Sequence, residues 1–479
     1  MASVKEQTIN SAKWNAIERI TVQGIQFVLT LLMARLLTPD DYGVIGLLTI
    51  FIALSQAFID SGFNTALVRT KNAVEEDYST VFYFNFAIAI VCYTILFFAA
   101  PSIAAFFNQP ILVSVLRVYS ISLIINSLMA VQVSMLQIRL DFKSLAKRNV
   151  VATLLSGVIG VALAFWGFGV WALVFQNLVA SLVNLVFIIY ICRWIPTTGF
   201  CKDSFRRLGA FGSRLLAAGL LDTIYKNLTN FAIGKFYTST DLGFYTRGAQ
   251  FAQLPNSSIN GVLGTVTYPI LAKIQDDDER LLSVYRKYIQ MSSMSIFIVS
   301  GLMCAMAKPI ILFTLSEKWT GAIVFLSLFA FSCMFDHLNT INLNLLKVKG
   351  RSDLFLRLEI IKKSISITIL AIAVPFGVLA ICISKLIYNQ VAVFCNTYYT
   401  GKLFNYGYLA QFRDFLPYFF KTVIACVPAY ILTLSSLHNI VILILGTIVS
   451  LGIYYFLLRN DENMKELLST IKGKFFNKK

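Results

Sequence analysis

Charged and amide side chains occur at helical spacing inside long apolar segments of this sequence. They fall on one stripe of residues 11–37 and on one stripe of residues 207–235, at 100° per residue. The side chains on these two stripes are Glu18, Arg19, Gln23 and Gln26, followed by Asp222, Tyr225 and Lys226. An ionisable group inside a membrane-spanning helix costs roughly 2.5–3.5 kcal/mol, so such groups face a wet interior.

The two segments that follow these stripes carry further polar groups. The added residues are Asp60 in 41–67, and Arg247, Gln250, Gln253 and Asn260 in 240–272. Arginine and lysine bind phosphate oxygens, whereas amides and tyrosine bond sugar hydroxyls. The pattern predicts a net cationic cleft for a bulky, anionic, hydroxyl-rich ligand.

The cleft residues divide into two groups by their chemistry. The predicted ligand-binding residues are Arg19, Lys226, Arg247, Gln23, Gln26, Tyr225, Gln250, Gln253 and Asn260. The acids Glu18, Asp60 and Asp222 are candidates for binding a coupling ion. The alternative interpretation is internal ion pairing, most directly between Asp222 and Lys226, which are one helical turn apart.

The composition indicates that the segments carrying these residues lie in a membrane. The chain of 479 residues is 57% hydrophobic and 14% charged, and its mean hydropathy is +0.72. Soluble domains are about 45–50% apolar and about 25% charged. The eight cysteines form no CxxC pair and most lie in apolar runs, so they predict packing positions and neither a metal site nor a disulfide framework. No catalytic residue and no cofactor is expected.

The apolar runs predict an all-α integral membrane protein with about fourteen spans, each near the roughly 20 residues that cross a bilayer. The predicted spans are 11–37, 41–67, 78–101, 111–139, 147–166, 169–192, 207–235, 240–272, 282–306, 318–346, 357–375, 377–400, 412–434 and 438–458. Residues 309–316 either extend the ninth span or form a short re-entrant piece.

Lysine and arginine gather in alternate loops and in the tail after Arg459. The positive-inside rule then predicts that both termini are cytoplasmic. The net charge of +17 is therefore a topology signal, with some attraction to anionic lipid. A nucleic-acid partner is not expected, because that function needs the charge on one folded face.

The sequence contains an internal repeat, whose offset changes from 200 to 208 positions along the chain. Arg35, Thr38, Asp41 and Gly43 recur 200 positions later as Lys235, Thr238, Asp241 and Gly243, and Phe168-Gly169-Val170 recurs 208 positions later as Phe376-Gly377-Val378. Two parallel six-helix repeats follow, with a substrate path between them. The predicted division is an N-terminal lobe over 1–200, a second lobe over 201–405, and two added helices with a basic tail over 406–479.

Three motifs carry a resemblance to a known family. They are Ala34-Arg35-Leu36-Leu37-Thr38-Pro39-Asp40-Asp41-Tyr42-Gly43, Asp60-Ser61-Gly62-Phe63-Asn64, and Leu136-Gln137-Ile138-Arg139-Leu140-Asp141-Phe142. With these motifs the chain resembles Wzx-type flippases of the polysaccharide transporter family, in the MOP exporter superfamily that also holds multidrug (MATE) and lipid II flippases. The likeness covers roughly residues 10–400.

The resemblance implies alternating access by two lobes in a bacterial inner membrane. The implied ligand is an undecaprenyl-pyrophosphate-linked oligosaccharide for lipopolysaccharide or exopolysaccharide, with membrane lipid and other polysaccharide assembly proteins as partners. Related flippases use cationic residues of the cavity, and Arg19, Lys226 and Arg247 match them in location. The second helix offers Asp60 in place of a basic residue.

Two other functions remain as alternatives. A cation-coupled multidrug antiporter of the same fold needs an acidic cavity, which the basic stripes disfavour. A membrane-embedded polymerase or acyltransferase needs a sizeable outer loop or a histidine beside an acid, and the predicted outer loops are short. The two histidines are His337 and His438. His337 is interpreted as a packing residue, with a proton relay as its alternative.

Overall fold

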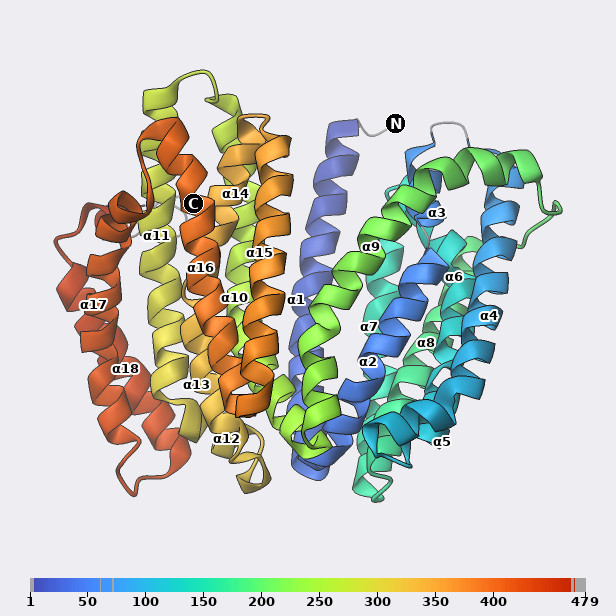
Figure 1. Cartoon of the computed structure of the whole chain (residues 1–479), viewed down its shortest axis with the longest axis horizontal. Helices are drawn as coiled ribbons and strands as arrows, with labels where there is room; N and C mark the ends of the chain where they lie inside the picture. The colour runs from blue at the N-terminus through green and yellow to red at the C-terminus, as the bar shows by residue number, and fades with distance from the viewer. Residues whose placement is uncertain (1–3, 61, 71–72, 467–468, 470–479) are drawn as a thin grey trace, which may run out of the picture. The chain divides into compact units, whose positions relative to one another are not determined.

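The computed structural model describes residues 4–60, 62–70, 73–466 and 469, and this part of the chain is built from helices (Figure 1). It divides into two compact units, Met1–Gly243 and Phe244–Lys479. Helices dominate because a helix satisfies its own backbone hydrogen bonds, which lipid cannot do.

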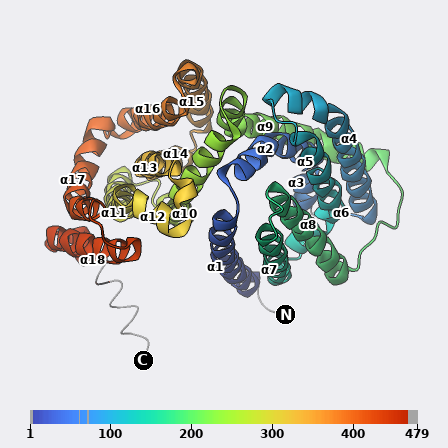
Figure 2. The same cartoon turned by 90° about the horizontal axis from the view of Figure 1, so that it is seen from below.

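Among the described residues, nine helices form the first unit, which also holds the first residues of α10. They are α1 (Val4–Leu36), α2 (Pro39–Asp60), α3 (Phe63–Arg69), α4 (Glu75–Phe107), α5 (Leu112–Tyr119), α6 (Ile121–Ile138), α7 (Phe142–Phe165), α8 (Val170–Cys192) and α9 (Lys202–Phe236). Helix α7 packs between α1 and α8, and α6 packs against α8 and α4. Figure 2 shows α7 between α1 and α8.

Helix α9 packs along α2, α3 and α4. At one end its Phe205 ring stacks on Phe63, with centroids 5.4 Å apart. Near the other end Gly234 lies against Leu47, so close that a Cβ would meet the leucine side chain at 2.0 Å. Small residues let helix backbones approach closely in membranes, so Gly234 sets how tightly α9 lies on α2.

An ion pair holds the beginning of α9 on α4. The Arg207 guanidinium donates to the Asp77 carboxylate, whose side chain is 0% exposed while that of Arg207 is 60% exposed. Asp77 also accepts from the backbone N–H of Val74 at 3.2 Å. A buried carboxylate needs such partners, because an unpaired one loses its hydration without compensation.

Replacing Arg207 with alanine should therefore destabilise the protein by about 1–3 kcal/mol, since it leaves Asp77 buried and short of a charged partner. Thermal unfolding of the purified protein in detergent measures this loss. Arg206→Ala is the matched control, because Arg206 is the exposed neighbour on the same helix. Equal melting temperatures for the two variants would contradict the role of the pair.

The second unit contains the remaining helices of the described chain. They are α10 (Ser239–Lys273, which begins in the first unit), α11 (Asp278–Ala305), α12 (Ala307–Thr314), η1 (Glu317–Trp319), α13 (Ala322–Cys333), α14 (Asp336–Val348), α15 (Ser352–Ala373), η2 (Val374–Phe376), α16 (Val378–Phe404), α17 (Tyr408–Leu432) and α18 (Asn439–Leu458).

Aromatic rings fill the centre of the second unit between α11, α14 and α17. Phe297 is fully buried and meets Phe335 and Phe415 edge to face, at centroid distances of 5.7 and 6.1 Å. Helix α17 packs on both α11 and α18. The two added helices predicted from the sequence, α17 and α18, are thus part of the second unit.

The helical segments follow the predicted spans, and ten of them in the described chain are long and apolar enough to cross a membrane. Helices α1, α9, α10 and α15 do not meet this criterion. Within the described residues α1 contributes the shorter apolar stretch Thr21–Leu36. The count of fourteen spans stays a prediction.

Two boundaries in the structure can be compared with those predicted from the sequence: the region 309–316 and the limit between the two halves of the chain. Residues 309–316 belong to α12 and the turn after it, where a break at Met306 separates α12 from α11. The first compact unit ends at Gly243 and therefore includes α9, whereas the sequence repeat assigns α9 to the second lobe. The predicted lobe limits at residues 200 and 405 come from the sequence repeat, and they stay predictions.

Candidate substrate site

The polar stripe of α1 lies on a helix that packs against α7. Glu18 accepts a hydrogen bond from the Asn149 amide, and Arg148 donates to the same asparagine at 2.8 Å. Gln23 is half-buried and Gln26 is exposed. The Arg19 side chain lies outside the described residues. Glu18 is thus part of a polar contact between α1 and α7, which limits it as an ion-coupling group.

On α9 the predicted residues form a local ion pair. The Lys226 ammonium lies 2.7 Å from the Asp222 carboxylate, one turn away, and the Lys226 side chain is 71% exposed. Tyr225 is half-buried beside them. The pairing that the sequence offered as an alternative is therefore present, yet most of the lysine side chain remains accessible. Exposed pairs of this kind are weak and exchange partners readily.

On α10 the guanidinium of Arg247 donates through Nη1 to Oε1 of Gln250 at 2.5 Å. Arg247 is half-buried, and Gln250 and Gln253 are exposed. The Asn260 side chain lies outside the described residues. A guanidinium has five N–H donors, and this hydrogen bond orients one of them along α10.

Asp60 ends α2 and is surrounded by amides. It accepts from Gln56 at 3.2 Å and from Asn64 at 3.4 Å. The buried Asn85 on α4 in turn donates to Asn64 at 3.1 Å. The role of Asp60 as an ion-coupling group stays a prediction.

The structure thus brings together some predicted site residues and not others. Asp222 and Lys226 contact each other on α9, and α9 packs on α2, which carries Asp60. Arg247 and Gln250 contact each other on α10, in the second unit. A single cleft that joins all of these residues remains a prediction.

Two repeated turns adopt the same structure and touch each other within the first unit. Thr38 donates through its hydroxyl to Asp41, and Thr238 does so to Asp241, both at 2.7 Å. In each turn the aspartate backbone N–H donates to the threonine hydroxyl. This reciprocal capping begins α2 and α10 alike. The repeat therefore preserves a helix-starting motif.

Glycine permits a reciprocal close approach of these turns. A Cβ on Gly43 would lie 1.7 Å from the Ser239 carbonyl oxygen, and one on Gly243 would lie 2.0 Å from that of Pro39. The Ser239 hydroxyl also donates to Asp40. These glycines are repeat positions of the sequence, but the sequence pattern does not predict that the two turns meet.

A seam of hydrogen-bonded polar side chains in the second unit, from Asn256 through Asp336 to Asn396, was not predicted from the sequence. Asp336 accepts from Asn256 at 2.9 Å and from Asn389 at 2.8 Å. Asn339 donates to Asn389, and Asn396 donates to Asn339, both at 2.7 Å. The spacing of Asp336, Asn339 and Asn342 at three residues in an apolar span was the available signal.

His337 lies beside this seam but faces another helix. Its Nε2 is 2.8 Å from the Ser293 hydroxyl, and its ring meets Phe297 edge to face at 5.6 Å. The side chain is fully buried. These contacts are those of a packing histidine.

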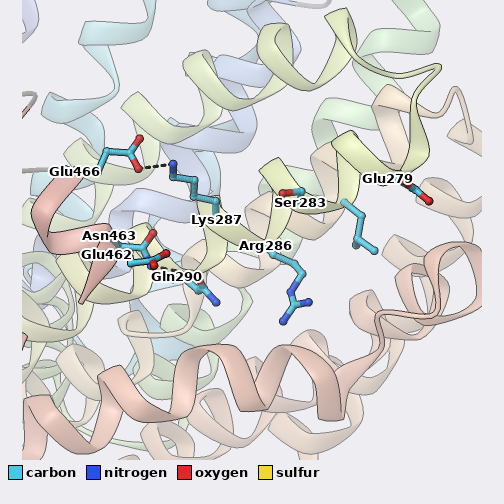
Figure 3. Close-up of a pocket in the computed structure, with 9 residues that line it drawn as sticks. Glu279, Ser283, Arg286, Lys287, Gln290, Glu462, Asn463 and Glu466 are labelled. Atoms are coloured by element: carbon cyan, nitrogen blue, oxygen red, sulfur yellow. Dashed lines mark hydrogen bonds and ion pairs between the residues drawn. The ribbon is translucent and has the colours of Figure 1, made fainter. Parts of the chain in front are cut away.

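A pocket of about 530 Å³ lies between the beginning of α11 and the segment after α18 (Figure 3). Arg286 is held by Asp414 through two hydrogen bonds of 2.9 Å, and Lys287 pairs with Glu466. Both basic side chains of the pocket are thus paired with carboxylates. This mixed-charge pocket was not predicted and differs from the cationic cleft expected for an anionic ligand.

Comparison with known proteins identifies the family. The model of the family described as "Polysaccharide biosynthesis protein" matches residues 32–324. The chain is 25% identical over 356 residues to the teichuronic acid biosynthesis protein TuaB of Bacillus subtilis (strain 168), which covers 74% of each chain. It is 24% identical over 364 residues to the lipopolysaccharide biosynthesis protein WzxC of Escherichia coli (strain K12), which covers 75% of this chain and 74% of WzxC.

A solved structure shares the fold. The lipid II flippase MurJ in its inward closed conformation matches with a TM-score of 0.71 at 15% identity, and the match covers 94% of this chain and 99% of that chain. Because the family model matches more than half of the chain, this protein belongs to the polysaccharide biosynthesis protein family, and it is a multi-pass membrane protein that shares its fold with MurJ.

Proposed function

We propose that this protein moves undecaprenyl-pyrophosphate-linked oligosaccharide, the repeat unit of a lipopolysaccharide or exopolysaccharide, from the cytoplasmic to the periplasmic leaflet. It works in the bacterial inner membrane with both termini in the cytoplasm. Membership of the polysaccharide biosynthesis protein family carries the proposal, and the similarity to TuaB and WzxC supports it. The cationic side chains of Lys226 on α9 and Arg247 on α10 support it as well.

The chemistry of the substrate supports the assignment of residues. Pyrophosphate oxygens are strong hydrogen-bond acceptors, and arginine binds them through a planar fork of donors while lysine acts as a point charge. Gln250 and Gln253, both exposed on α10, offer amide donors and acceptors for sugar hydroxyls. The polyprenyl tail stays in the bilayer, because burying it in a polar cleft would forfeit its hydrophobic stabilisation.

Alternating access supplies the route across the membrane. Repeats related by an axis along the membrane normal rock about a site near their interface. The contact between the two Thr-x-x-Asp turns would seal the periplasmic side when the cleft opens to the cytoplasm. Separation of the two turns would release the glycan to the periplasmic side. Other polysaccharide assembly proteins would then consume the product, which favours net export.

The test is leaflet transfer of a purified pyrophosphate-linked oligosaccharide in proteoliposomes that contain the full chain. Accessibility of the glycan to an added glycosidase reports the leaflet. We expect protein-dependent transfer of the glycolipid and no transfer of undecaprenyl monophosphate without a glycan. Transport of cationic dyes under an ion gradient, with no glycolipid transfer, would contradict the proposal and favour an antiporter.

A further inference from the structure

A proline interrupts the helical hydrogen bonds of α4. Pro101 lies inside this helix, near its last residue, Phe107. Proline has no backbone N–H, so the carbonyl four residues earlier, that of Phe97, loses its helical donor. This helix is long and apolar enough to cross a membrane, and lipid offers no replacement donor. The Phe97 carbonyl therefore needs a donor from another part of the chain.

An arginine on the next helix supplies that donor. The Nε atom of Arg117 on α5 donates to the Phe97 carbonyl at 3.1 Å. The guanidinium carbon of Arg117 also lies 4.2 Å from the centroid of the Phe97 ring, which is a cation–π distance. Helix α5 packs against α4 (Figure 1). The contact gives the carbonyl a donor and gives a charged side chain in an apolar segment an acceptor, and lipid can meet neither need.

The part of α4 beyond Pro101 holds the end of α9. Lys235 of α9 donates to the Phe106 carbonyl at 2.8 Å, and its ammonium lies 3.8 Å from the centroid of the Phe106 ring. The Phe106 ring also stacks on Phe231, with centroids 5.7 Å apart. A cation at the C-terminal end of a helix is favourable, because that end carries partial negative charge. The direction in which α4 continues after Pro101 therefore fixes where it meets α9.

A glutamine just after this helix end contacts the paired turns. Gln109 donates through Nε2 to the Ser239 hydroxyl at 3.0 Å, and Ser239 is 4% exposed. That hydroxyl donates to Asp40, and the Ser239 carbonyl is the group that Gly43 approaches. Gln109 is itself fixed to α4, because its backbone N–H donates to the Ala104 carbonyl at 3.0 Å, in a pattern that commonly ends a helix. A displacement of the end of α4 would thus carry Ser239 with it.

We infer that Arg117 and Gln109 are positioning residues for the contact between the two Thr-x-x-Asp turns. Arg117 fixes the course of α4 at Pro101, and Gln109 holds Ser239 against the turn that begins α2. The two side chains act at the two ends of one short segment, residues 101–109. Neither residue needs to touch the substrate. Their role in transport rests on the proposed flippase function, in which the turn contact seals the periplasmic side, but their effect on the contact does not.

Thiol labelling of Leu242→Cys measures how often the turn contact opens. Leu242 lies within the second turn and is 0% exposed, so a maleimide reaches a cysteine there only when the contact separates. The experiment uses the purified full chain with its eight cysteines replaced by alanine. Arg117→Leu should raise the labelling rate about tenfold, because it removes a charged hydrogen-bond donor but keeps an apolar side chain. Ser114→Ala on the same helix is the control, since the Ser114 hydroxyl donates locally, to the Ile111 carbonyl at 3.1 Å.

Replacing the proline separates the role of Arg117 as a donor from a general packing role. Pro101→Ala returns an N–H to position 101, so the Phe97 carbonyl regains a donor from its own helix. In the Pro101→Ala background, Arg117→Leu should change the labelling rate by less than about twofold, against about tenfold with the proline present. Equal effects in the two backgrounds would overturn the role of Arg117, because an arginine that merely packs on α4 acts alike in both.

An isosteric change tests Gln109. Gln109→Glu keeps the size of the side chain but replaces the amide donor with a carboxylate, which repels Asp40 on the other side of the Ser239 hydroxyl. It should raise the labelling rate of Leu242→Cys about tenfold. Asn108→Asp is the control, since it adds the same charge at the exposed neighbouring residue. Equal labelling rates for Gln109→Glu and Asn108→Asp would overturn the role of Gln109.

The labelling experiment needs no glycolipid, so it is independent of the flippase proposal. Labelling that neither Arg117→Leu nor Gln109→Glu accelerates would overturn this inference and leave the flippase proposal standing. Failure of glycolipid transfer by the wild type likewise leaves the labelling rates measurable. Faster labelling together with undiminished glycolipid transfer would confirm that the two residues position the turns and would overturn their role in transport.

Discussion

Gly43→Val should reduce glycolipid transfer at least about tenfold while the protein still reaches the membrane. A Cβ at this position would lie 1.7 Å from the Ser239 carbonyl oxygen, a backbone atom that cannot rotate away. Overpacking costs about 1–3 kcal/mol or more, and about 1.4 kcal/mol is tenfold in an equilibrium. The two capped turns would be forced apart, so the closed form of this contact would be rarely populated.

Transfer in proteoliposomes measures the loss, and cysteine crosslinking measures its cause. In an Asp40→Cys, Ser239→Cys background, whose hydroxyl–carboxylate contact places these side chains together, Gly43→Val should lower the crosslinked fraction. Gly243→Val should act likewise, because its Cβ would meet the Pro39 carbonyl oxygen at 2.0 Å. Gly452→Val is the control, since a Cβ at Gly452 meets nothing within 4 Å. Undiminished transfer by both turn variants would exclude a gating role for the contact.

Arg247→Ala and Lys226→Ala should each lower glycolipid transfer about ten- to hundredfold. A hydrogen bond to a charged group contributes about 1.5–3 kcal/mol, and each of these side chains is expected to lose such bonds to pyrophosphate oxygens. Neither change should unfold the protein, because Lys226 is 71% exposed and Arg247 is held by one turn of its own helix. Arg35→Ala, at an exposed position near the turn, should have a smaller effect.

Asp222→Asn separates substrate binding from internal pairing. If Lys226 serves only its ion pair with Asp222, removing the carboxylate should impair transfer as much as removing the lysine. If Lys226 binds the substrate, Asp222→Asn leaves the ammonium available, and transfer should be kept or increased. Normal transfer by both Lys226→Ala and Arg247→Ala would disprove the assignment of these residues to the substrate.

Local spacing in the sequence accounts for some contacts among the predicted site residues. The Asp222–Lys226 pair and the Arg247–Gln250 hydrogen bond join residues one helical turn apart, so helical spacing alone places them together. The paired Thr-x-x-Asp caps are equally local. The contact of Glu18 with Asn149, 131 residues away, was not predictable in this way, because spacing does not say which helices pack together.

The sequence by itself determined the class of this protein: a helical, multi-pass membrane protein of the polysaccharide biosynthesis protein family. Apolar length, caps and charge placement are properties of each segment, and a spanning helix satisfies its backbone without neighbours. Only the tertiary structure decided that Gly43 meets Ser239, that Arg207 neutralises a buried Asp77, and that Arg117 donates to the Phe97 carbonyl. Those contacts depend on which helix faces meet, and many pairings satisfy the same hydropathy pattern equally well.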